Sequence, residues 1–212
     1  SKVHKQYLII QDRPVLYYSL KAFEDSAVDE IVLVVGKGEE EFCRREIVDK
    51  YGISKVKAIV EGGKERYHSV FEGLKQTSDA DYVLIHDGAR PFVDQDIIRR
   101  CMQEVQKYQA CVVGMPVKDT IKIADEEGYA KQTPDRKNVW MIQTPQTFSY
   151  ALIYEAYEEM LKTEDTAITD DAMVLERIKG KKSKLIEGSY RNIKITTPED
   201  LLIANVYLQH PE

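Results

Sequence analysis

The segment YVLIHDGARPF (82–92) places an acid and a guanidinium directly after an apolar run. Asp87 can accept hydrogen bonds from the hydroxyls of a ribose or a polyol, or help to hold a metal ion. Arg90 can bind a phosphate through two parallel hydrogen bonds. Gly88 lets the backbone turn sharply or approach a ligand closely. The alternative is a structural Asp–Arg pair that closes a turn, and this motif alone leaves both open.

Further polar segments follow other apolar runs. In EGGKERYHS (61–69), glycines precede polar residues at the expected start of a helix, a pattern that suits a phosphate or a base edge. QTPQTF (143–148) follows the short apolar run WMI, and TAITDDAM (166–173) has hydroxyls and acids before a helix. A simple turn or a helix cap is the alternative in each case.

Cations and hydroxyls complete the candidate set. Lys194 lies between two isoleucines in a predicted strand, and Lys5 lies in KVHKQYL; solvent exposure is the alternative for both. The other members are the cations Arg90 and Arg136 and the hydroxyls of Ser69, Thr120, Thr144 and Thr169. The sequence contains no evident Ser–His–Asp set and no activated cysteine. A phosphate-binding pocket without a protein nucleophile favours phosphoryl or nucleotidyl transfer, in which catalysis is mostly positioning and charge stabilisation.

Continuous apolar runs of strand length predict the sheet that must position these residues. They are EIVLVVG (30–36), VKAIVEGG (56–63), YVLIHDG (82–88) and CVVGMPV (111–117). Such runs are typical of parallel strands buried on both faces. Helical apolar spacing lies between them, and TPEDLLIANVYL begins a further helix with Thr197 as its N-cap. The alternation predicts an α/β fold with a doubly wound, mostly parallel sheet, whose ligands bind at the carboxyl ends of strands.

Residues 117–139 depart from this alternation. DTIKIA is short and alternating, DEEG is a turn, and YAKQT can return as its partner, so the segment predicts a β-hairpin arm. The arm has little apolar area to bury on its own sheet, and we expect it to lie on a second subunit. The sequence has no internal repeat and no low-complexity linker. We therefore predict one domain, 1–212, with an arm at 117–139.

Composition excludes several classes of protein. The chain has 212 residues, 43% of them hydrophobic and 31% charged, and a formal net charge of −6. This balance is typical of a globular protein and gives no global attraction to nucleic acid. No apolar run approaches the ~20 residues that span a bilayer. The three cysteines have no metal-like spacing, and we expect Cys101 and Cys111 to be core residues. Without disulfides or a structural zinc site, we expect a cytoplasmic protein without membrane or nucleic-acid partners.

Seven motifs occur in an order that is known from one enzyme family: HKQYL, GGKERYHSV, HDGARPF, PVKDTIK, QTPQTF, ITDDA and EGSYRNIKITTPEDL. Over essentially its whole length the chain resembles the 2-C-methyl-D-erythritol 4-phosphate cytidylyltransferases of the non-mevalonate isoprenoid pathway. The resemblance implies a Rossmann-like homodimer, joined through the arm, that uses CTP and Mg²⁺. The phosphate of the phosphorylated polyol attacks the α-phosphorus of CTP and releases pyrophosphate. The metal is expected mainly on the CTP phosphates, with Asp87 as a candidate ligand.

The resemblance also implies roles for single residues. Lys5 matches the lysine that stabilises charge on the α-phosphate, Lys194 matches the lysine that positions the attacking phosphate, and Arg136 is the third expected catalytic residue. The expected nucleotide-binding residues are Gly62, Gly63, Lys64, Ser69, Asp87 and Gly88. The expected acceptor-binding residues are Asp87, Arg90, Thr120, Arg136, Thr144, Thr169 and Lys194. Thr120 and Arg136 lie on the arm and are expected to reach into the partner's site.

Family members begin with a strand and a glycine-rich loop upstream of the KQYL motif, whereas this sequence starts at Ser1. We expect the native protein to have these upstream residues, because the first strand of a doubly wound sheet is central. Two other functions have to be compared with the first. Ribitol-5-phosphate cytidylyltransferases share HDxxRPF, QTPQ and NIKITTP, but PVKDTIK and TPDRKNVW in the arm favour the methylerythritol enzyme. A non-catalytic nucleotide-binding regulator is the other alternative.

Overall fold

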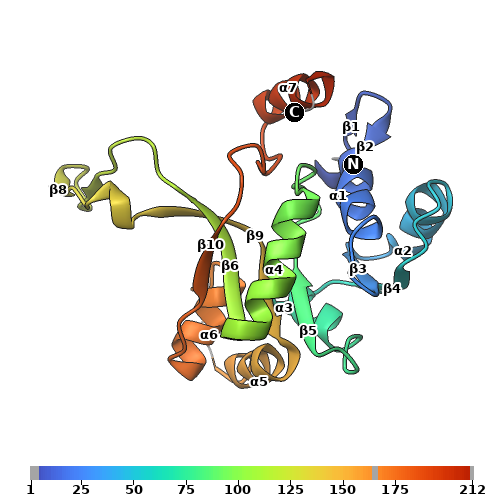
Figure 1. Ribbon diagram of the computed structural model, residues 1–212, viewed down its shortest axis with the longest axis horizontal. Helices are drawn as coiled ribbons and strands as arrows, with labels where there is room; N and C mark the ends of the chain where they lie inside the picture. Colours follow the sequence, from blue (N-terminus) through green and yellow to red (C-terminus); the bar gives the residue numbers. More distant parts are fainter. Residues whose placement is uncertain (1–4, 164–166, 211–212) are drawn as a thin grey trace.

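The computed structural model describes residues 5–163 and 167–210, which form an α/β fold around a mixed sheet (Figure 1). Within these residues the main sheet has the order β10-β6-β9-β5. Its strands are β5 (Tyr82–Ile85), β6 (Ala110–Pro116), β9 (Trp140–Ser149) and β10 (Lys184–Glu187). Only β9 is antiparallel to its neighbours, so three strands run in one direction. The predicted fold class is confirmed.

A second sheet consists of two parallel strands, β3 (Ile31–Val35) and β4 (Val56–Glu61). Among the described residues, β3 pairs only with β4, and β5 pairs only with β9. Each of these two strands therefore has an edge without a partner strand in this part of the chain. The expectation of a further strand upstream of residue 1 stays a prediction.

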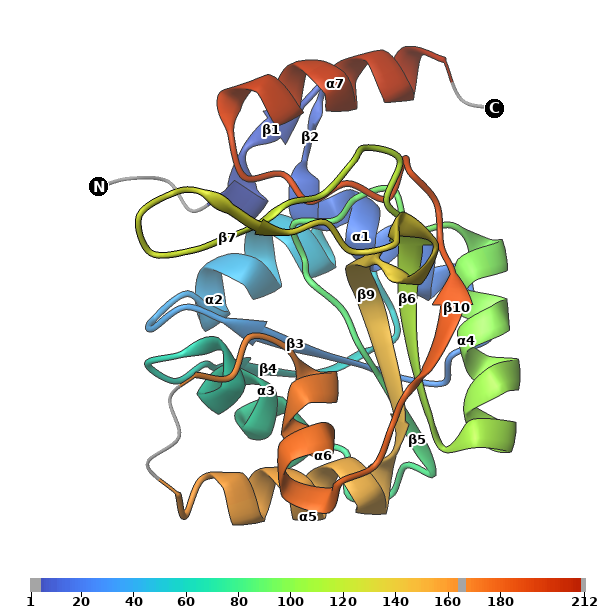
Figure 2. The same ribbon diagram turned by 90° about the vertical axis from the view of Figure 1, so that its left-hand side faces the viewer.

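Helices cover both faces of the main sheet, and further helices lie outside it. The α-helices of the described residues are α1 (Val15–Glu24), α2 (Glu40–Cys43), α3 (Arg66–Leu74), α4 (Gln95–Tyr108), α5 (Tyr150–Met160), α6 (Asp171–Lys179) and α7 (Pro198–Gln209). Figure 2 shows α4 on one side of β6 and β9, with α5 and α6 on the other. The predicted cap of α7 is confirmed, because Thr197 and Asp200 form a reciprocal capping box.

The apolar strand runs follow from this two-sided burial. On β6, Val112 packs against α5 and α6, whereas Cys111 and Val113 pack against α4. On β5, Val83 likewise packs on the side of α5 and α6, whereas Leu84 packs on the side of α4. A strand buried on both faces needs an apolar side chain at every position, because successive side chains point in opposite directions. The three cysteines are free and buried, which confirms the prediction of core positions for Cys101 and Cys111.

The predicted arm is present as a hairpin of β7 (Ile123–Ala124) and β8 (Ala130–Gln132). The Asp125 carboxylate closes its turn by accepting from the backbone N–H groups of Glu127 and Tyr129, at 3.2 and 2.8 Å. The short helix η3 (Arg136–Asn138) then leads into β9. Figure 1 shows the arm extending sideways from the sheet, away from the helices.

Two predictions about local structure are wrong. Lys194 does not lie on a strand: residues 192–196 form an extended loop, in which the Ile195 N–H donates to the carbonyl of Ala89 at 2.8 Å. QTPQTF does not follow a strand but lies inside β9, where Gln143, Thr144 and Gln146 are buried polar residues. Their side chains bind loop and helix atoms, so this strand tolerates polar residues that a simple apolar run would exclude.

The remaining elements precede or follow α1 and α2. They are η1 (Lys5–Tyr7), β1 (Ile9–Ile10), β2 (Arg13–Pro14) and the π-helical segment η2 (Arg44–Asp49). Together with α1, the segment η2 packs on β3 and β4 through a separate apolar cluster. In the part of the chain that the structure describes, no helix is both long enough and apolar enough to cross a membrane.

The N-cap of α4 gives a first test of the fold. The Asp94 carboxylate accepts from the Ile97 N–H at 2.7 Å, and Ile97 is fully buried. We expect Asp94→Ala to lower the free energy of unfolding by ~1 kcal/mol, because the N–H loses its partner. Urea denaturation measures this loss. Gln103→Ala, at an exposed position of the same helix, is the control; equal midpoints for the two variants would contradict the assignment of the cap.

Candidate active site

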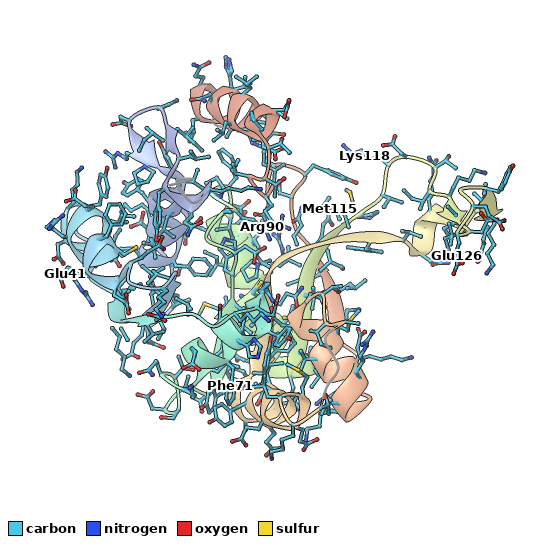
Figure 3. All side chains as sticks on the ribbon, turned by 180° about the vertical axis from the view of Figure 1, so that it is seen from behind. Glu41, Phe71, Arg90, Met115, Lys118 and Glu126 are labelled. Atoms are coloured by element: carbon cyan, nitrogen blue, oxygen red, sulfur yellow. The ribbon has the colours of Figure 1, made fainter. Side chains whose placement is uncertain are left out.

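Asp87 lies directly after β5 and is surrounded by cations from three segments. Lys194 Nζ lies 3.0 Å from its Oδ2, Arg90 Nε lies 3.6 Å from Oδ2, and Arg66 Nε lies 3.4 Å from Oδ1. The side chains of Asp87 and Arg90 are only 15% and 12% exposed, whereas that of Lys194 is 43% exposed. The sequence-predicted Asp87, Arg90 and Lys194 therefore meet at one place. Figure 3 shows Arg90 in the body of the molecule, apart from the arm.

The charge of Asp87 follows from these neighbours. Burial on its own would raise the pKa of the Asp87 carboxyl, but the positive charges of Arg66 and Lys194 outweigh burial and hold this pKa at about 2. Asp87 is therefore an anion throughout the physiological range. As an anion it accepts hydrogen bonds only, which matches the hydroxyls of a sugar or a polyol.

The loop that carries Asp87 is fixed by a threonine and a histidine. The Thr144 hydroxyl accepts from the Asp87 N–H at 3.1 Å and lies 2.9 Å from Nδ1 of His86. His86 Nε2 lies 3.1 Å from the carbonyl of Arg90. Burial lowers the pKa of His86 to about 4, so its ring is neutral. In that state the Thr144 hydroxyl donates to Nδ1, and Nε2–H donates to the Arg90 carbonyl.

The loop that carries Lys194 is fixed by a buried asparagine. Asn192 Nδ2 donates to the carbonyl of Thr144 at 2.9 Å and to Oε1 of Gln143 at 3.2 Å. The Asn192 carbonyl in turn accepts from Arg90 Nη1 at 2.8 Å. Strand β9 thus holds both the Asp87 loop and the Lys194 loop. The hydroxyl of the predicted acceptor-binding residue Thr144 is engaged within this network.

The glycine-rich segment before α3 packs closely on the helix that follows it. The Gly63 N–H donates to the Ser69 hydroxyl at 3.1 Å. A Cβ atom on Gly62 would lie 2.6 Å from that hydroxyl, and one on Gly63 would lie 2.3 Å from Cβ of His68, so neither position has room for a side chain. The next residue, Lys64, is exposed. Arg66, the first residue of α3, connects this segment with Asp87.

The other predicted residues are not among the ion-pair partners of Asp87 in the described part of the chain. Lys5 begins η1 and is exposed. Thr120 and Arg136 lie on the arm, where Arg136 Nη1 donates to the carbonyl of Lys118 at 3.2 Å. Thr169 precedes α6, and Gly88 packs beside Leu16 of α1. Thr166, in the predicted segment 166–173, lies outside the described residues.

Sequence reasoning missed Arg66, His86 and Asn192. Arg66 was part of a quoted motif, but its partner Asp171 is 105 residues away along the chain. His86 has no paired ligand spacing, and Asn192 lies in the motif EGSYRNIKITTPEDL, where only Lys194 stands out as a candidate. The signal that could have found His86 is its position directly before Asp87, at the end of a strand. Asn192 carries no comparable signal.

Comparison with known proteins decides the family. The family model described as 2-C-methyl-D-erythritol 4-phosphate cytidylyltransferase matches residues 1–210. The chain belongs to this family. The enzyme of that name from Lachnospira eligens is 52% identical over 211 residues, which cover 99% of this chain and 92% of the relative. The enzyme from Lachnoclostridium phytofermentans is 49% identical over 209 residues, which cover 99% and 90%.

Solved structures agree with this result. The crystal structure of 4-diphosphocytidyl-2C-methyl-D-erythritol synthase from Anaerococcus prevotii superposes with a TM-score of 0.89 at 37% identity, covering 98% of this chain and 91% of that one. The cytidylyltransferase from Thermus thermophilus gives 0.82 at 32% identity, covering 97% and 94%. The predicted family, fold and nucleotidyltransferase class are confirmed. The ribitol and regulator alternatives receive no support from these matches.

The side chains around Asp87 do not fit a metal site in which the protein supplies the ligands. Oδ1 of Asp87 faces Arg66, and Oδ2 faces Lys194 and Arg90. Three cations within 3.6 Å of this carboxylate repel a divalent ion placed beside it. Among the described residues, no group of three or more histidine, cysteine or acidic side chains could hold a metal. The cluster suits an anion instead.

The neutral state of His86 predicts a pH dependence of stability. In the unfolded chain a histidine titrates near pH ~6.5, whereas the folded pKa is about 4. Between these values the unfolded state binds more protons, so stability is complete above the unfolded pKa and falls as the pH drops toward 4. We expect His86→Asn to be less stable at pH 7.5 and to lose less stability across this window. His210→Asn, at an exposed position, should keep the wild-type slope in denaturation series.

Proposed function

We propose that the chain transfers the cytidylyl group of CTP to 2-C-methyl-D-erythritol 4-phosphate at the Asp87 cluster. A phosphate oxygen of the acceptor forms a bond to the α-phosphorus of CTP. The bond from that phosphorus to the bridging oxygen breaks, and pyrophosphate leaves. The observation that carries the proposal is the cluster itself, in which three cations face two acids, Asp87 and Asp171. One positive charge remains in excess, as binding of a phosphorylated polyol requires.

The acceptor is proposed to lie over the Asp87 loop. Lys194 and Arg90 bind its phosphate and reduce the repulsion between that phosphate and the phosphates of CTP. Asp87 accepts hydrogen bonds from its hydroxyls, while Thr144 keeps the Asp87 backbone in place. Thr169 is proposed to contribute its hydroxyl from the segment before α6. In this arrangement the positive charges of Lys194 and Arg90 face the phosphate of the substrate. The Asp87 carboxylate faces its polyol hydroxyls and accepts their hydrogen bonds.

The nucleotide is proposed to lie on the neighbouring loops. Gly62 and Gly63 bring the backbone close to the cytosine and the ribose, and Lys64 and Ser69 lie beside them. The backbone of Gly88, next to Asp87, is proposed to contact the same ligand. Lys5 supplies a cation to the α-phosphate. Mg²⁺ is proposed to bind through the CTP phosphates, since Asp87 is occupied by cations.

The arm is proposed to complete the site of a second subunit. Tyr129 at its tip is 73% exposed and Ile123 is 46% exposed, although both are apolar enough to be buried in a stable fold. Figure 3 shows Glu126, at the far end of the arm, well away from Arg90. Thr120 and Arg136 would then act on a partner's acceptor. Three free, buried cysteines also fit the cytoplasm that we propose as its location.

The reaction is tested by measuring pyrophosphate release with CTP and Mg²⁺. Methylerythritol phosphate and ribitol phosphate are offered in parallel. We expect release with methylerythritol phosphate alone, because the chain belongs to the family that is named for this acceptor. Release with ribitol phosphate alone would assign the protein to the alternative acceptor, and no release with either would support a regulator.

Lys194 is the acceptor residue that is easiest to test. Its side chain is 43% exposed, and Arg66 and Arg90 still face Asp87 in Lys194→Ala, so we expect only a small fall in the unfolding midpoint. We expect turnover to fall by ~10²–10³-fold, because a charge on the attacking phosphate loses its partner. Lys182→Ala, an exposed lysine on the segment before β10, is the matched control. Turnover within twofold of wild type in Lys194→Ala would rule out the proposed role.

The arm is tested by mixing two inactive variants. In a mixture of Arg136→Ala and Lys194→Ala subunits, a mixed dimer has one site with both side chains intact if the arm acts on the partner. Statistical exchange then restores about a quarter of wild-type turnover, because half of the dimers are mixed and each has one intact site of two. If the arm acts within its own chain, the mixture stays as inactive as its components. Light scattering of each variant verifies that it is a dimer.

A further inference from the structure

A buried chain of polar groups lies behind Asp87 and begins at Asp171. The Asp171 side chain is 0% exposed, and it accepts from Arg66 Nη1 and Nη2 at 2.9 and 2.8 Å. The Tyr157 hydroxyl, also fully buried, donates to the same carboxylate at 2.5 Å. Arg66 then reaches Asp87 through its Nε, 3.4 Å from Oδ1. The chain Tyr157–Asp171–Arg66–Asp87 thus crosses α5, α6, α3 and the end of β5.

Tyr157 and Arg66 each keep one protonation state. Burial and the neighbouring Asp171 charge raise the pKa of Tyr157 well above its ordinary value, so its hydroxyl remains a donor. Burial on its own would lower the pKa of Arg66, but the charge and hydrogen bonds of Asp171 outweigh burial and raise it. A guanidinium bound through both Nη atoms has a fixed plane, and its Nε–H therefore points in one direction. That direction is toward Asp87.

The three cations around Asp87 differ in how they are held. Lys194 has a partly exposed, flexible side chain, and it pairs with Asp87. Arg90 is also bound to the carbonyl of Asn192. Only Arg66 is held by a second, fully buried carboxylate. A ligand phosphate that attracts Lys194 and Arg90 weakens their pairing with Asp87, whereas Arg66 stays in place.

We propose that Arg66, anchored by Asp171 and Tyr157, is a positioning residue that holds Asp87 in the geometry needed for the acceptor when a phosphate draws Lys194 and Arg90 away. This inference rests on the proposed role of Asp87 in binding the acceptor. Arg66 acts through Asp87, and Asp171 acts through Arg66. The ion pair between Arg66 and Asp171 therefore does more than join α3 to α6.

The first test compares kinetic constants of variants that keep the fold. Arg66→Lys retains the positive charge but cannot bind two carboxylates at fixed angles. We expect its KM for methylerythritol phosphate to rise by ~10-fold or more. This is the change in affinity that corresponds to the loss of one charge-assisted hydrogen bond. Arg66→Gln and Asp171→Asn should show the same effect, and the double variant should be no worse than Arg66→Gln. Additive losses in the double variant, or wild-type constants in Arg66→Lys, would overturn the proposal.

A matched control separates positioning from attachment of α6. Gln146 holds the start of that helix independently of Arg66, because its Oε1 accepts from the Ala172 N–H at 2.9 Å and its Nε2 donates to Asp170 at 3.0 Å. We expect Gln146→Ala to lower the unfolding midpoint while the KM for the acceptor stays within twofold. An acceptor KM in Gln146→Ala as high as that in Asp171→Asn would mean that displacement of α6 explains both, and would overturn the proposal.

The second test does not depend on turnover. The carboxyl carbons of the aspartates are labelled, and the Asp87 resonance is assigned by its loss in Asp87→Asn. Four groups face this carboxyl, namely Arg66, Arg90, Lys194 and His86. We expect its titration to move to higher pH in Arg66→Gln and Asp171→Asn, and to keep its wild-type value in Gln146→Ala. An unshifted titration in Arg66→Gln would overturn the inference, whereas a shift in an enzyme without cytidylyl transfer would reject the proposed function alone.

Discussion

The position of one carboxylate, Asp87, sets the arrangement of the surrounding loops. A largely buried acid is costly unless cations and hydrogen bonds compensate for the lost water. Arg66, Arg90 and Lys194 meet this requirement, and they come from three segments that are remote from one another in sequence. A side chain that binds all three fixes the relative positions of the start of α3, the 86–92 loop and the segment before α7. The cluster can therefore present cations and an anion to one ligand without large rearrangement.

Strand β9 carries the second half of this arrangement. Thr144 binds the backbone of Asp87, and the Thr144 carbonyl binds Asn192. Gln143 also binds Asn192, and Gln146 binds the start of α6. Antiparallel β9 lies between β5 and β6, so its polar side chains reach the ends of elements on either side. Each of these side chains has at least one hydrogen-bond partner, although Oδ1 of Asn192 has none among the described residues. The shared partners hold the ends of these elements together.

The sequence predicts the fold well because two-sided burial leaves a local signature. The apolar runs of β3, β4, β5 and β6 were found, and so were the arm and the α7 cap. The cluster around Asp87 is predictable in part, because Asp87, Arg90 and Lys194 stand out in the sequence as polar groups beside apolar runs. Arg66 with Asp171 was missed, because a pair separated by 105 residues leaves no local pattern. Lys194 was placed on a strand because its isoleucine neighbours alternate, but the backbone there binds the carbonyl of Ala89 instead of a strand.

The three cations around Asp87 lose different amounts of freedom when a ligand binds. Arg66 is already ordered by a bidentate pair, and Arg90 is held by a backbone carbonyl, so neither has much side-chain entropy left to lose. Lys194 has the long, flexible side chain and the greatest exposure of the three. In the proposed reaction it is therefore the cation that can follow a phosphate from the bound acceptor to the new diphosphate bond. Arg66 is fixed by Asp171, Arg90 is tethered to a backbone carbonyl, and Lys194 is the most mobile of the three. Such a cluster would combine a rigid site with a charge that can move along the proposed reaction path.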